Sequence, residues 1–546
     1  MKRRRFLAAS ALALAACRPH PDISGGFVGA ALERGHLLRA PLLQRSPRTS
    51  HRTRVLVVGG GVAGLAACRA LRLRGMHDFT LLELEDTAGG NSRGGEVNGI
   101  SCPLGAHYLP VPLEVAAGLA GNPVQDLLEE LGLYQRIAGR WVYDERHLCH
   151  SPQERLFING QWQSGLLPLE GLQRLQAAAL QDYQRFAQLV LQAAKTSKFS
   201  IPVQNKPVAG DLLALDAITF DVWLSQHQLT SAPLRWYLDY CCRDDYGAGL
   251  SAVSAWAGIH YFASRHGFAA PGEQAAERES GVLTWPEGNG WLTQQLAKPL
   301  GERLATGQAV LRVAAGKHGV EVDALNTASG QIERWQADHC IMALPLFVAA
   351  KVIENPPPAL QAAARAAYAP WLVANVHLHS ALHDRPGPAP SWDNVVYGGD
   401  GAAKPGQGHA EGLGYVDAMH QSLSQVRGAT VLTHYRAFGI APARRQHLYQ
   451  QPWAYWRDVI LAELAEPHPD LPGKVSRIDI MRYGHAMRVP VPGTRANPAL
   501  RALQNPLPAP WQRLQFAHSD LSGYSVFEEA FTHGHMKGSF AGLSSD

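Results

Sequence analysis

A glycine-rich turn near the start of the chain has the spacing of a phosphate-binding loop. Residues 54–58 are a run of strand formers, and residues 65–71 have a helical pattern. Between them lie Gly59, Gly61 and Gly64. Glycines at this spacing permit a tight turn, a close approach of the backbone to a pyrophosphate and close packing of the helix. The turn is therefore predicted to bind a dinucleotide, with a glycine turn that holds no ligand as the alternative.

An acid and two further glycines extend this prediction. Glu83 ends the next strand-like run, where a carboxylate can accept hydrogen bonds from an adenosine ribose. Gly89 and Gly90 offer bare backbone N–H groups, and Arg93 adds a forked cation. The N-terminus of the helix contributes free N–H groups and a partial positive charge. The predicted cofactor-binding residues of this region are Gly59, Gly61, Val62, Ala63, Gly64, Glu83, Gly89, Gly90 and Arg93.

The acid, spacer and Gly-Gly segment resembles that of the flavin-containing amine oxidase superfamily, which also includes carotenoid desaturases and protoporphyrinogen oxidases. Further segments in the family's order are similar to the rest of its FAD domain: residues 285–291, 309–313, 340–345 and 514–524. The resemblance implies that Val310 contacts the adenine side through its backbone and that Asp520 holds a ribityl hydroxyl. It also implies non-covalent FAD, because the cysteine that carries covalent flavin in some relatives has no clear match.

The same resemblance implies an α/β fold. A Rossmann-like FAD-binding domain of the glutathione-reductase type is expected over residues 53–110, 281–355 and 507–546. A discontinuous α+β substrate domain is expected over residues 111–280 and 356–506. Catalysis would then take place where the two domains meet.

Four side chains are candidates for the substrate side of the site. His107 lies in a Gly-Ala-His-Tyr segment similar to one that passes near the flavin ring, and a core histidine is the alternative. Tyr483 and Tyr524 lie in segments that resemble substrate-lining ones, with simple packing as the competing interpretation. Asn375 stands where many amine oxidases have a lysine that holds a water against the flavin. Asparagine can position water but is not a cation, which weakens the case for amine oxidation specifically.

The histidines and cysteines do not predict a metal site. His377 and His379 would lie on one face of a strand, with His383 nearby, but no acid or cysteine spacing supports them. The six cysteines after Cys17 have no C-x-x-C spacing and suggest neither zinc nor a disulfide framework.

These observations together predict a hydride transfer from a small-molecule substrate to FAD. The resemblance favours an amine or polyamine as substrate, with O₂ or another acceptor reoxidising the flavin. One alternative is a desaturase or oxidase that acts on an apolar or lipid-like substrate. The other is a lipoprotein that contains flavin without catalysing a reaction.

The net charge of +4 lies in the N-terminal segment, at Lys2, Arg3, Arg4 and Arg5. Since the rest of the chain is formally neutral, we predict no nucleic-acid partner. Residues 1–16 have the basic, apolar and small-residue parts of a signal peptide, with an amphipathic helix as the alternative. The segment resembles a twin-arginine signal followed by a lipobox, which implies use of the twin-arginine machinery and acylation of Cys17. We therefore expect a periplasmic protein held to the membrane by a lipid anchor, with residues 17–52 as a tether.

Overall fold

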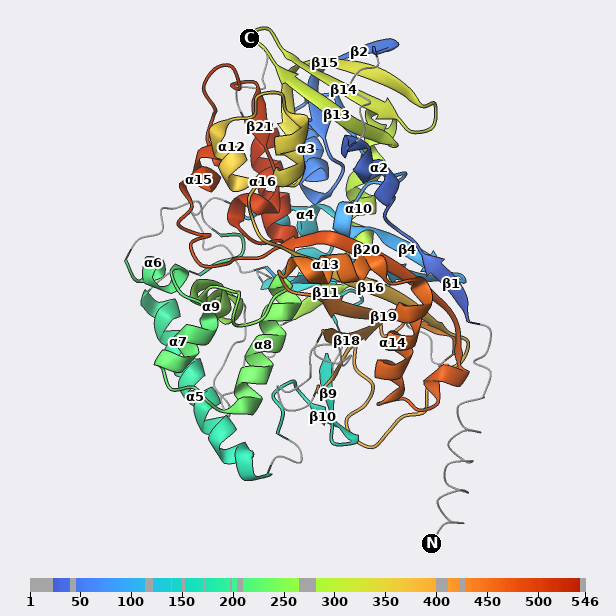
Figure 1. The fold of residues 1–546 in the computed structure, drawn as a ribbon, viewed down its shortest axis with the longest axis vertical. Helices are drawn as coiled ribbons and strands as arrows, with labels where there is room; N and C mark the ends of the chain where they lie inside the picture. Colours follow the sequence, from blue (N-terminus) through green and yellow to red (C-terminus); the bar gives the residue numbers. More distant parts are fainter. Residues whose placement is uncertain are drawn as a thin grey trace.

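Two β-sheets organise the chain in the computed structural model (Figure 1). The signal segment 1–16 and Cys17 lie outside the described residues. The structure describes residues 23–39, 46–112, 121–138, 140–149, 153–169, 173–196, 199–203, 210–264, 281–398, 411–421 and 428–540.

The first sheet is the dinucleotide half of the molecule. Its strand order is β12-β3-β2-β15-β14-β13, and β21 pairs with β15. β2, β3 and β15 are parallel at the centre, where Val57 pairs with both Leu81 and Ile341. All three side chains are fully buried, as expected for a parallel sheet covered on both faces. The strands are β2 (Thr49–Val58), β3 (Phe79–Leu82), β12 (Leu304–Ala305), β13 (Gln308–Ala315), β14 (Val320–Asn326), β15 (Gln331–Met342) and β21 (Leu514–Phe516).

Two helices of this half pack closely against each other. α3 (Val62–Leu73) follows the glycine turn, and α16 (Phe527–Gly538) packs along it. A Cβ added at Gly534 would lie 2.0 Å from the carbonyl oxygen of Ala63, so only glycine allows this approach. α10 (Gly290–Ala297) contacts α3 as well.

The boundaries of this half differ from those predicted. α4 (Pro123–Glu130) was expected in the substrate domain, but its apolar side chains join the core around α3 and α16. α12 (Pro358–Ala363) and α15 (Pro498–Gln504) likewise pack on the first sheet, together with α11 (Leu346–Val352). Short helices from inside both predicted substrate segments therefore complete the hydrophobic packing on the first sheet.

The second sheet has the order β1-β20-β16-β19-β18-β17-β9-β10. Its central strand β16 is buried along its whole length. Leu372 and Ala374 face the core beneath α14, whereas Trp371 and Val373 face the core that includes α8. The strands are β1 (Ser24–Phe27), β9 (Glu154–Ile158), β10 (Gln161–Ser164), β16 (Tyr368–Leu378), β17 (Asp393–Val396), β18 (Gly412–Asp417), β19 (Thr430–Ala437) and β20 (Val475–Arg488).

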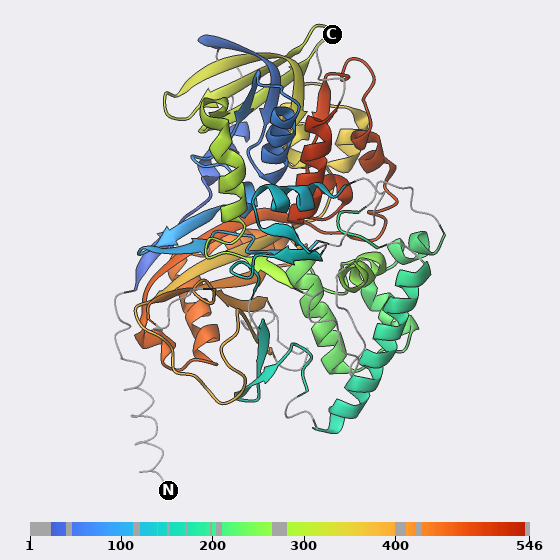
Figure 2. The ribbon, with the colours of Figure 1, turned by 180° about the vertical axis from the view of Figure 1, so that it is seen from behind.

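Helices cover both faces of the second sheet. α13 (Pro442–Gln450) and α14 (Trp453–Ala465) lie on one face, as Figure 1 shows. A helical lobe stands beside the other face, seen from behind in Figure 2. Its helices are α5 (Gln173–Thr196), α6 (Asp211–Asp216), α7 (Phe220–Gln226), α8 (Ala232–Tyr246) and α9 (Ala255–Ala263).

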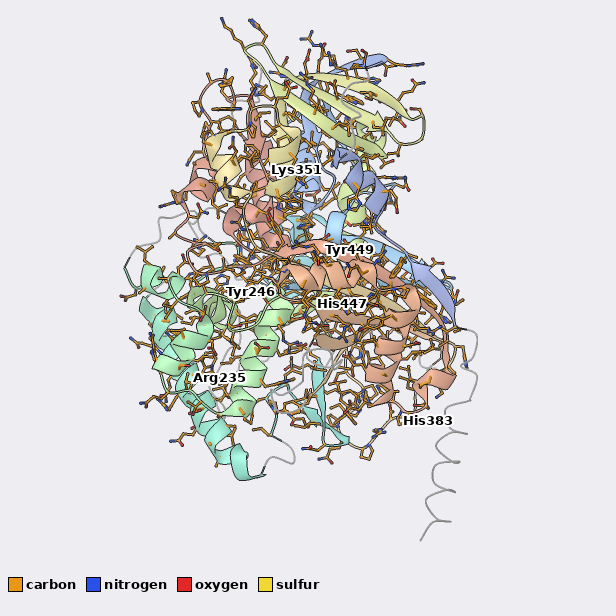
Figure 3. All side chains as sticks on the ribbon, viewed as in Figure 1. Arg235, Tyr246, Lys351, His383, His447 and Tyr449 are labelled. Carbon is orange, nitrogen blue, oxygen red and sulfur yellow. The ribbon has the colours of Figure 1, made fainter. Side chains whose placement is uncertain are left out.

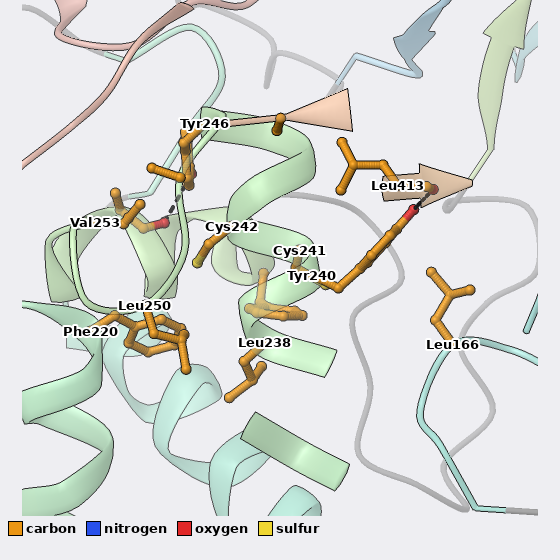
Figure 4. Close-up of a cluster of buried hydrophobic side chains, with 14 of the residues drawn as sticks. Leu166, Phe220, Leu238, Tyr240, Cys241, Cys242, Tyr246, Leu250, Val253 and Leu413 are labelled. Atoms are coloured by element: carbon orange, nitrogen blue, oxygen red, sulfur yellow. Dashed lines mark hydrogen bonds between the residues drawn. The ribbon is translucent and has the colours of Figure 1, made fainter. Parts of the chain in front are cut away.

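Side chains of the lobe interlock with the sheet. Tyr246, labelled in Figure 3, ends α8 where the lobe meets the rest of the molecule. In the buried cluster of Figure 4, the hydroxyl of Tyr240 donates to the carbonyl oxygen of Leu413 on β18 at 3.4 Å. The lobe and the second sheet therefore share one core.

Part of the expected tether is folded. β1 pairs in parallel with β20, from Ser24 opposite Arg477 to Phe27 opposite Ile480. The guanidinium carbon of Arg482 lies 3.5 Å from the centre of the Phe27 ring. The short helix α2 (Leu32–His36) then reaches the first sheet, where Arg34 pairs with Asp86. This segment therefore touches both halves, which the sequence prediction of a tether did not anticipate.

Within the described residues, three short two-stranded sheets accompany the two large ones. They are formed by β4 (Gly94–Val97) with β5 (Ile100–Pro103), β6 (Tyr108–Pro110) with β11 (Val282–Thr284), and β7 (Tyr134–Ile137) with β8 (Arg140–Tyr143).

Within the described ranges, no helix has the length and apolar character needed to cross a membrane. The same part of the chain holds no group of three potential metal ligands, and its six cysteines are buried and unbridged.

Candidate active site

The glycine turn is built without side chains. Gly59 has a φ of 105°, and a Cβ added at Gly64 would lie 1.9 Å from the carbonyl oxygen of Gly59. Helix α3 begins at Val62, and no side chain caps it at Gly61. The first N–H groups of the helix, at Val62, Ala63 and Gly64, thus point from an uncapped helix end, which suits a phosphate.

Glu83 is joined to this turn. Its Oε2 accepts a hydrogen bond from the Gly60 amide at 2.6 Å, and its Oε1 accepts one from the Glu85 amide at 2.8 Å. Burial raises the pKa of Glu83, while these two amides act in the opposite direction. Each carboxylate oxygen retains a second lone pair for a ribose hydroxyl.

The second pair of glycines faces the first. The Gly89 amide donates to the Gly60 carbonyl at 2.8 Å. Gly90 has a φ of 57°, and its added Cβ would lie 3.1 Å from the Gly61 Cα. The buried Arg93 donates from Nε to the Gly90 carbonyl at 3.1 Å. Two bare loops and a cation therefore converge, which is the donor set a pyrophosphate requires.

The predicted Val310 lies on a strand that touches Glu83. Gln308, two residues earlier on β13, donates its amide to the Glu83 carbonyl at 2.7 Å. Val310 pairs with Ala324, and a bulge follows it. Its contact with an adenine stays a prediction.

Asp520 is fully buried between the two halves. Its Oδ2 accepts hydrogen bonds from the Leu346 amide at 2.9 Å and the Tyr368 hydroxyl at 2.5 Å. Burial alone would raise the pKa of Asp520, but His518, Arg488 and Tyr368 outweigh it and lower the pKa to about 2. Its buried Oδ1 forms no hydrogen bond and lies 3.3 Å from His518 Nδ1 in an ion-pair contact, so it can still accept a hydrogen bond from a ligand hydroxyl. The bare glycine loops, Glu83 and this buried acceptor oxygen together fit FAD.

A loop over residues 103–108 joins the cofactor side to the substrate side. Side chains of the second sheet donate to the first three carbonyl oxygens of this loop. Asn375 Nδ2 donates to Pro103 O at 3.0 Å. Tyr483 Oη donates to Leu104 O at 2.7 Å, and Tyr435 Oη donates to Gly105 O at 2.9 Å. The dinucleotide half binds the next three: the Asn289 amide donates to Ala106 O, Thr284 to His107 O and Asn289 Nδ2 to Tyr108 O. Six consecutive carbonyls are therefore satisfied from two different halves.

His107 lies on this loop among aromatic rings. Its ring centre is 4.6 Å from that of Tyr435, 5.3 Å from that of Trp392 and 5.1 Å from that of Tyr108. Burial lowers the pKa of His107 to about 3. The imidazole is therefore neutral near pH 7 and is a poor general base there.

The structure brings His107, Asn375 and Tyr483 together at the loop, but it places Tyr524 elsewhere. Asn375 is fully buried, and its Oδ1 accepts from Thr433 at 2.8 Å. Tyr524 lies among Tyr246, Trp256 and His260 of the helical lobe, and its hydroxyl donates to Glu529 at 2.7 Å. Whether these four residues act on a substrate stays a prediction.

Sequence reasoning missed Tyr435 and Trp392. Both are single aromatic residues without a motif around them, so nothing in the sequence separates them from ordinary core residues. The available signal was the alternation of β19, which places Tyr435 on the same face as Thr433. Thr433 in turn pairs with Asn375 in the neighbouring strand.

Acidic side chains lie near Tyr435, and one of them, Asp393, follows Trp392 in the chain. Asp393 and Glu154 are partners in the parallel pair of β17 and β9, so their side chains share one face. Burial raises the pKa of Asp393 well above its usual range, and the nearby carboxyls of Asp244 and Glu154 raise it further. The Glu154 side chain is exposed at its surface, but the protein atoms around its carboxyl desolvate it and raise its pKa to about 7. Acidic side chains that resist ionisation therefore adjoin the aromatic group.

Comparisons with known proteins agree on the fold and the cofactor. The family described as flavin containing amine oxidoreductase matches residues 62–536. An L-amino acid dehydrogenase of Synechocystis sp. is 25% identical over 305 residues, which cover 55% of this chain and 58% of that protein. The chain spans little more than half the length of the curated relatives it matches.

Two solved structures have a similar fold. Putrescine oxidase bound to putrescine has a TM-score of 0.60 and 15% identity, over 90% of this chain and 98% of the oxidase. A fatty acid isomerase from P. acnes has a TM-score of 0.60 and 14% identity, over 88% of this chain and 97% of the isomerase. At these identities the likeness concerns the fold alone. The family match over residues 62–536 shows that the chain belongs to the flavin-containing amine oxidoreductase family.

Proposed function

We propose that this protein oxidises a small amine at the carbon next to nitrogen. The observation that carries the proposal is the neutral His107 among Tyr108, Trp392 and Tyr435, on a loop bonded to the predicted FAD loops. An uncharged aromatic wall does not repel an incoming ammonium and excludes water around it. When bound, FAD supplies the two-electron acceptor for this chemistry.

The acidic side chains support an amine rather than an anion. Asp393 and Glu154 lie side by side, and Asp244 adjoins them. An ammonium bound beside them would favour their ionised form, so the acids and a cationic substrate would stabilise each other's charge. The relatives point in the same direction, since one acts on L-amino acids and one binds putrescine by name.

The chain's residues position the amine and need not remove a proton from carbon. Hydride loss from a neutral amine requires only that the ammonium has first given a proton to solvent. His107 stays neutral throughout the physiological range, because its pKa is about 3. The residues around it therefore act by orientation and by exclusion of water.

Anaerobic mixing of the purified holoprotein with a panel of substrates tests the proposal. Monoamines, diamines and L-amino acids are added separately, and the visible flavin absorption is followed. We expect at least one amine to bleach the flavin. If dithionite bleaches it and no amine does, amine oxidation is excluded.

A second candidate is an apolar or lipid-like substrate. The aromatic group around His107 and the fold shared with a fatty acid isomerase favour it. Unsaturated fatty acids therefore belong in the same panel. Bleaching or isomerisation with these and not with amines would select this candidate.

We also propose export and lipid anchoring, on the strength of the first seventeen residues. The basic and apolar segment supports export, and Leu14-Ala15-Ala16-Cys17 supports acylation. Labelling of cells with a fatty acid should mark the wild-type protein and not Cys17→Ala. If neither protein is labelled, the proposed lipid anchor is excluded.

A further inference from the structure

The 103–108 loop is held between the dinucleotide loop and the second sheet. On the first side, the Leu104 amide donates to the Arg93 carbonyl at 2.9 Å, and the Ala106 amide donates to the Asn91 carbonyl at 2.8 Å. A Cβ added at Gly105 would lie 2.2 Å from the Asn91 carbonyl oxygen. The loop therefore lies directly against the segment that follows Gly89 and Gly90.

On the other side, the three donors come from three neighbouring strands. Asn375 is on the central strand β16, with Tyr435 on β19 and Tyr483 on β20. In the sheet, Tyr435 is the partner of Val373 and Tyr483 is the partner of Trp371. Since Trp371, Val373 and Asn375 alternate along one face of β16, all three donors lie on the same face.

The two tyrosines remain donors at every working pH. Burial raises the pKa of Tyr483 to about 12, and it raises the pKa of Tyr435 well above the usual range. Tyr435 has a second contact, because its ring lies 4.6 Å from the His107 ring. One side chain thus fixes both the loop backbone and the histidine that the loop carries.

We infer that Asn375, Tyr435 and Tyr483 are positioning residues, whose hydrogen bonds to three successive carbonyls fix the 103–108 loop and His107 against the dinucleotide loop. They act through the loop and not on the substrate. The inference rests on the proposed function only where its test measures reaction with a substrate.

Tyr435→Phe is the direct test, and Tyr415→Phe is its matched control. Tyr415 lies on the adjacent strand β18, and its buried hydroxyl bonds to His468 Nε2 at 2.6 Å, away from the loop. Both variants lose one buried hydroxyl bond. In the holoprotein we measure the visible circular dichroism of the flavin, its reduction potential, the thermal midpoint and the anaerobic rate of bleaching.

A positioning role predicts that Tyr435→Phe alters the flavin dichroism and potential and lowers the bleaching rate by about tenfold to a hundredfold. Tyr415→Phe should change the thermal midpoint alone. Equal thermal losses in both variants, with unchanged flavin signals and rates, would overturn the inference.

If Tyr435→Phe does not fold, Tyr483→Phe is measured in the same way, since Tyr483 is only half-buried. If no amine bleaches the wild type, the proposed function fails, while the dichroism and potential still decide the positioning role.

Discussion

The backbone amide of Gly60 lies 2.6 Å from Oε2 of Glu83. The glycine turn and the acid at the end of the second strand are therefore one structural unit. A change at Glu83 affects both the expected ribose contact and the turn that faces the pyrophosphate.

Glu83→Ala should weaken FAD binding. The substitution leaves the buried Gly60 amide without its partner and removes the acceptor for the ribose. Loss of a hydrogen bond to a charged group costs about 1.5–3 kcal/mol, or about ten- to a hundredfold in affinity. Fluorescence of released flavin measures the dissociation constant. Asp86→Ala is the control, because Asp86 is largely exposed and bonds to Arg34; equal affinities in the two variants would contradict the role of Glu83.

His107 should make the stability depend on pH. Its pKa is about 3 in the folded protein against 6.5 when unperturbed, so the unfolded state binds the proton first. The stability that neutral His107 contributes is complete above pH 6.5 and is lost as the pH falls toward 3. The loss is at most about 1.4 kcal/mol per pH unit.

Urea unfolding of wild type and His107→Asn at pH 7, 6 and 5 measures this dependence. The wild type should lose more stability than the variant as the pH falls. Parallel curves would show that His107 is not held neutral.

Asp393→Asn should raise the KM for an amine. A bound ammonium would favour the ionised form of Asp393, and one such charge pair is worth about 1 kcal/mol in a well-solvated setting, which corresponds to a several-fold change. The kcat should change less, because the charge attracts the substrate without touching the reacting carbon. Asp458→Asn on α14, at the opposite face of the sheet, is the control. A KM that rises equally in both variants would argue against local attraction.

Gly25→Ala should release β1 from the second sheet. Gly25 has a φ of 135°, and an added Cβ would lie 1.9 Å from the Ile478 carbonyl oxygen. The adjacent Gly26 offers a matched control, since its added Cβ would meet nothing within 4 Å. Limited proteolysis should cut the N-terminal segment faster in Gly25→Ala than in wild type or Gly26→Ala. Equal cutting rates would mean that β1 does not depend on this register.

The dinucleotide half was predictable because its chemistry is local in sequence. Gly59, Gly61 and Gly64 stand between a strand and a helix, and the structure joins them to Glu83 as the spacing implies. The α/β fold with two interleaved parts was predicted correctly. β1 was not, since Ser-Gly-Gly-Phe has weak strand propensity and gains its pairing only from β20, more than four hundred residues later.

The substrate side depends on contacts distant in sequence. Tyr435 and Tyr483 act on carbonyls more than three hundred residues away, and no periodicity reveals which carbonyl a lone tyrosine will meet. The same limit applies to Tyr524, whose neighbours Tyr246 and Trp256 belong to a separate helical segment. The placement of α4 and α15 on the first core also follows from such contacts.

The central claim is that this chain places the carbon next to an amine nitrogen against FAD for loss of a hydride. The most direct measurement compares the anaerobic bleaching rate with an amine that carries hydrogen or deuterium at that carbon. The account predicts that the flavin is bleached and that deuterium slows the bleaching. Bleaching by dithionite alone, or equal rates with the two isotopes when the chemical step is rate-limiting, would contradict it.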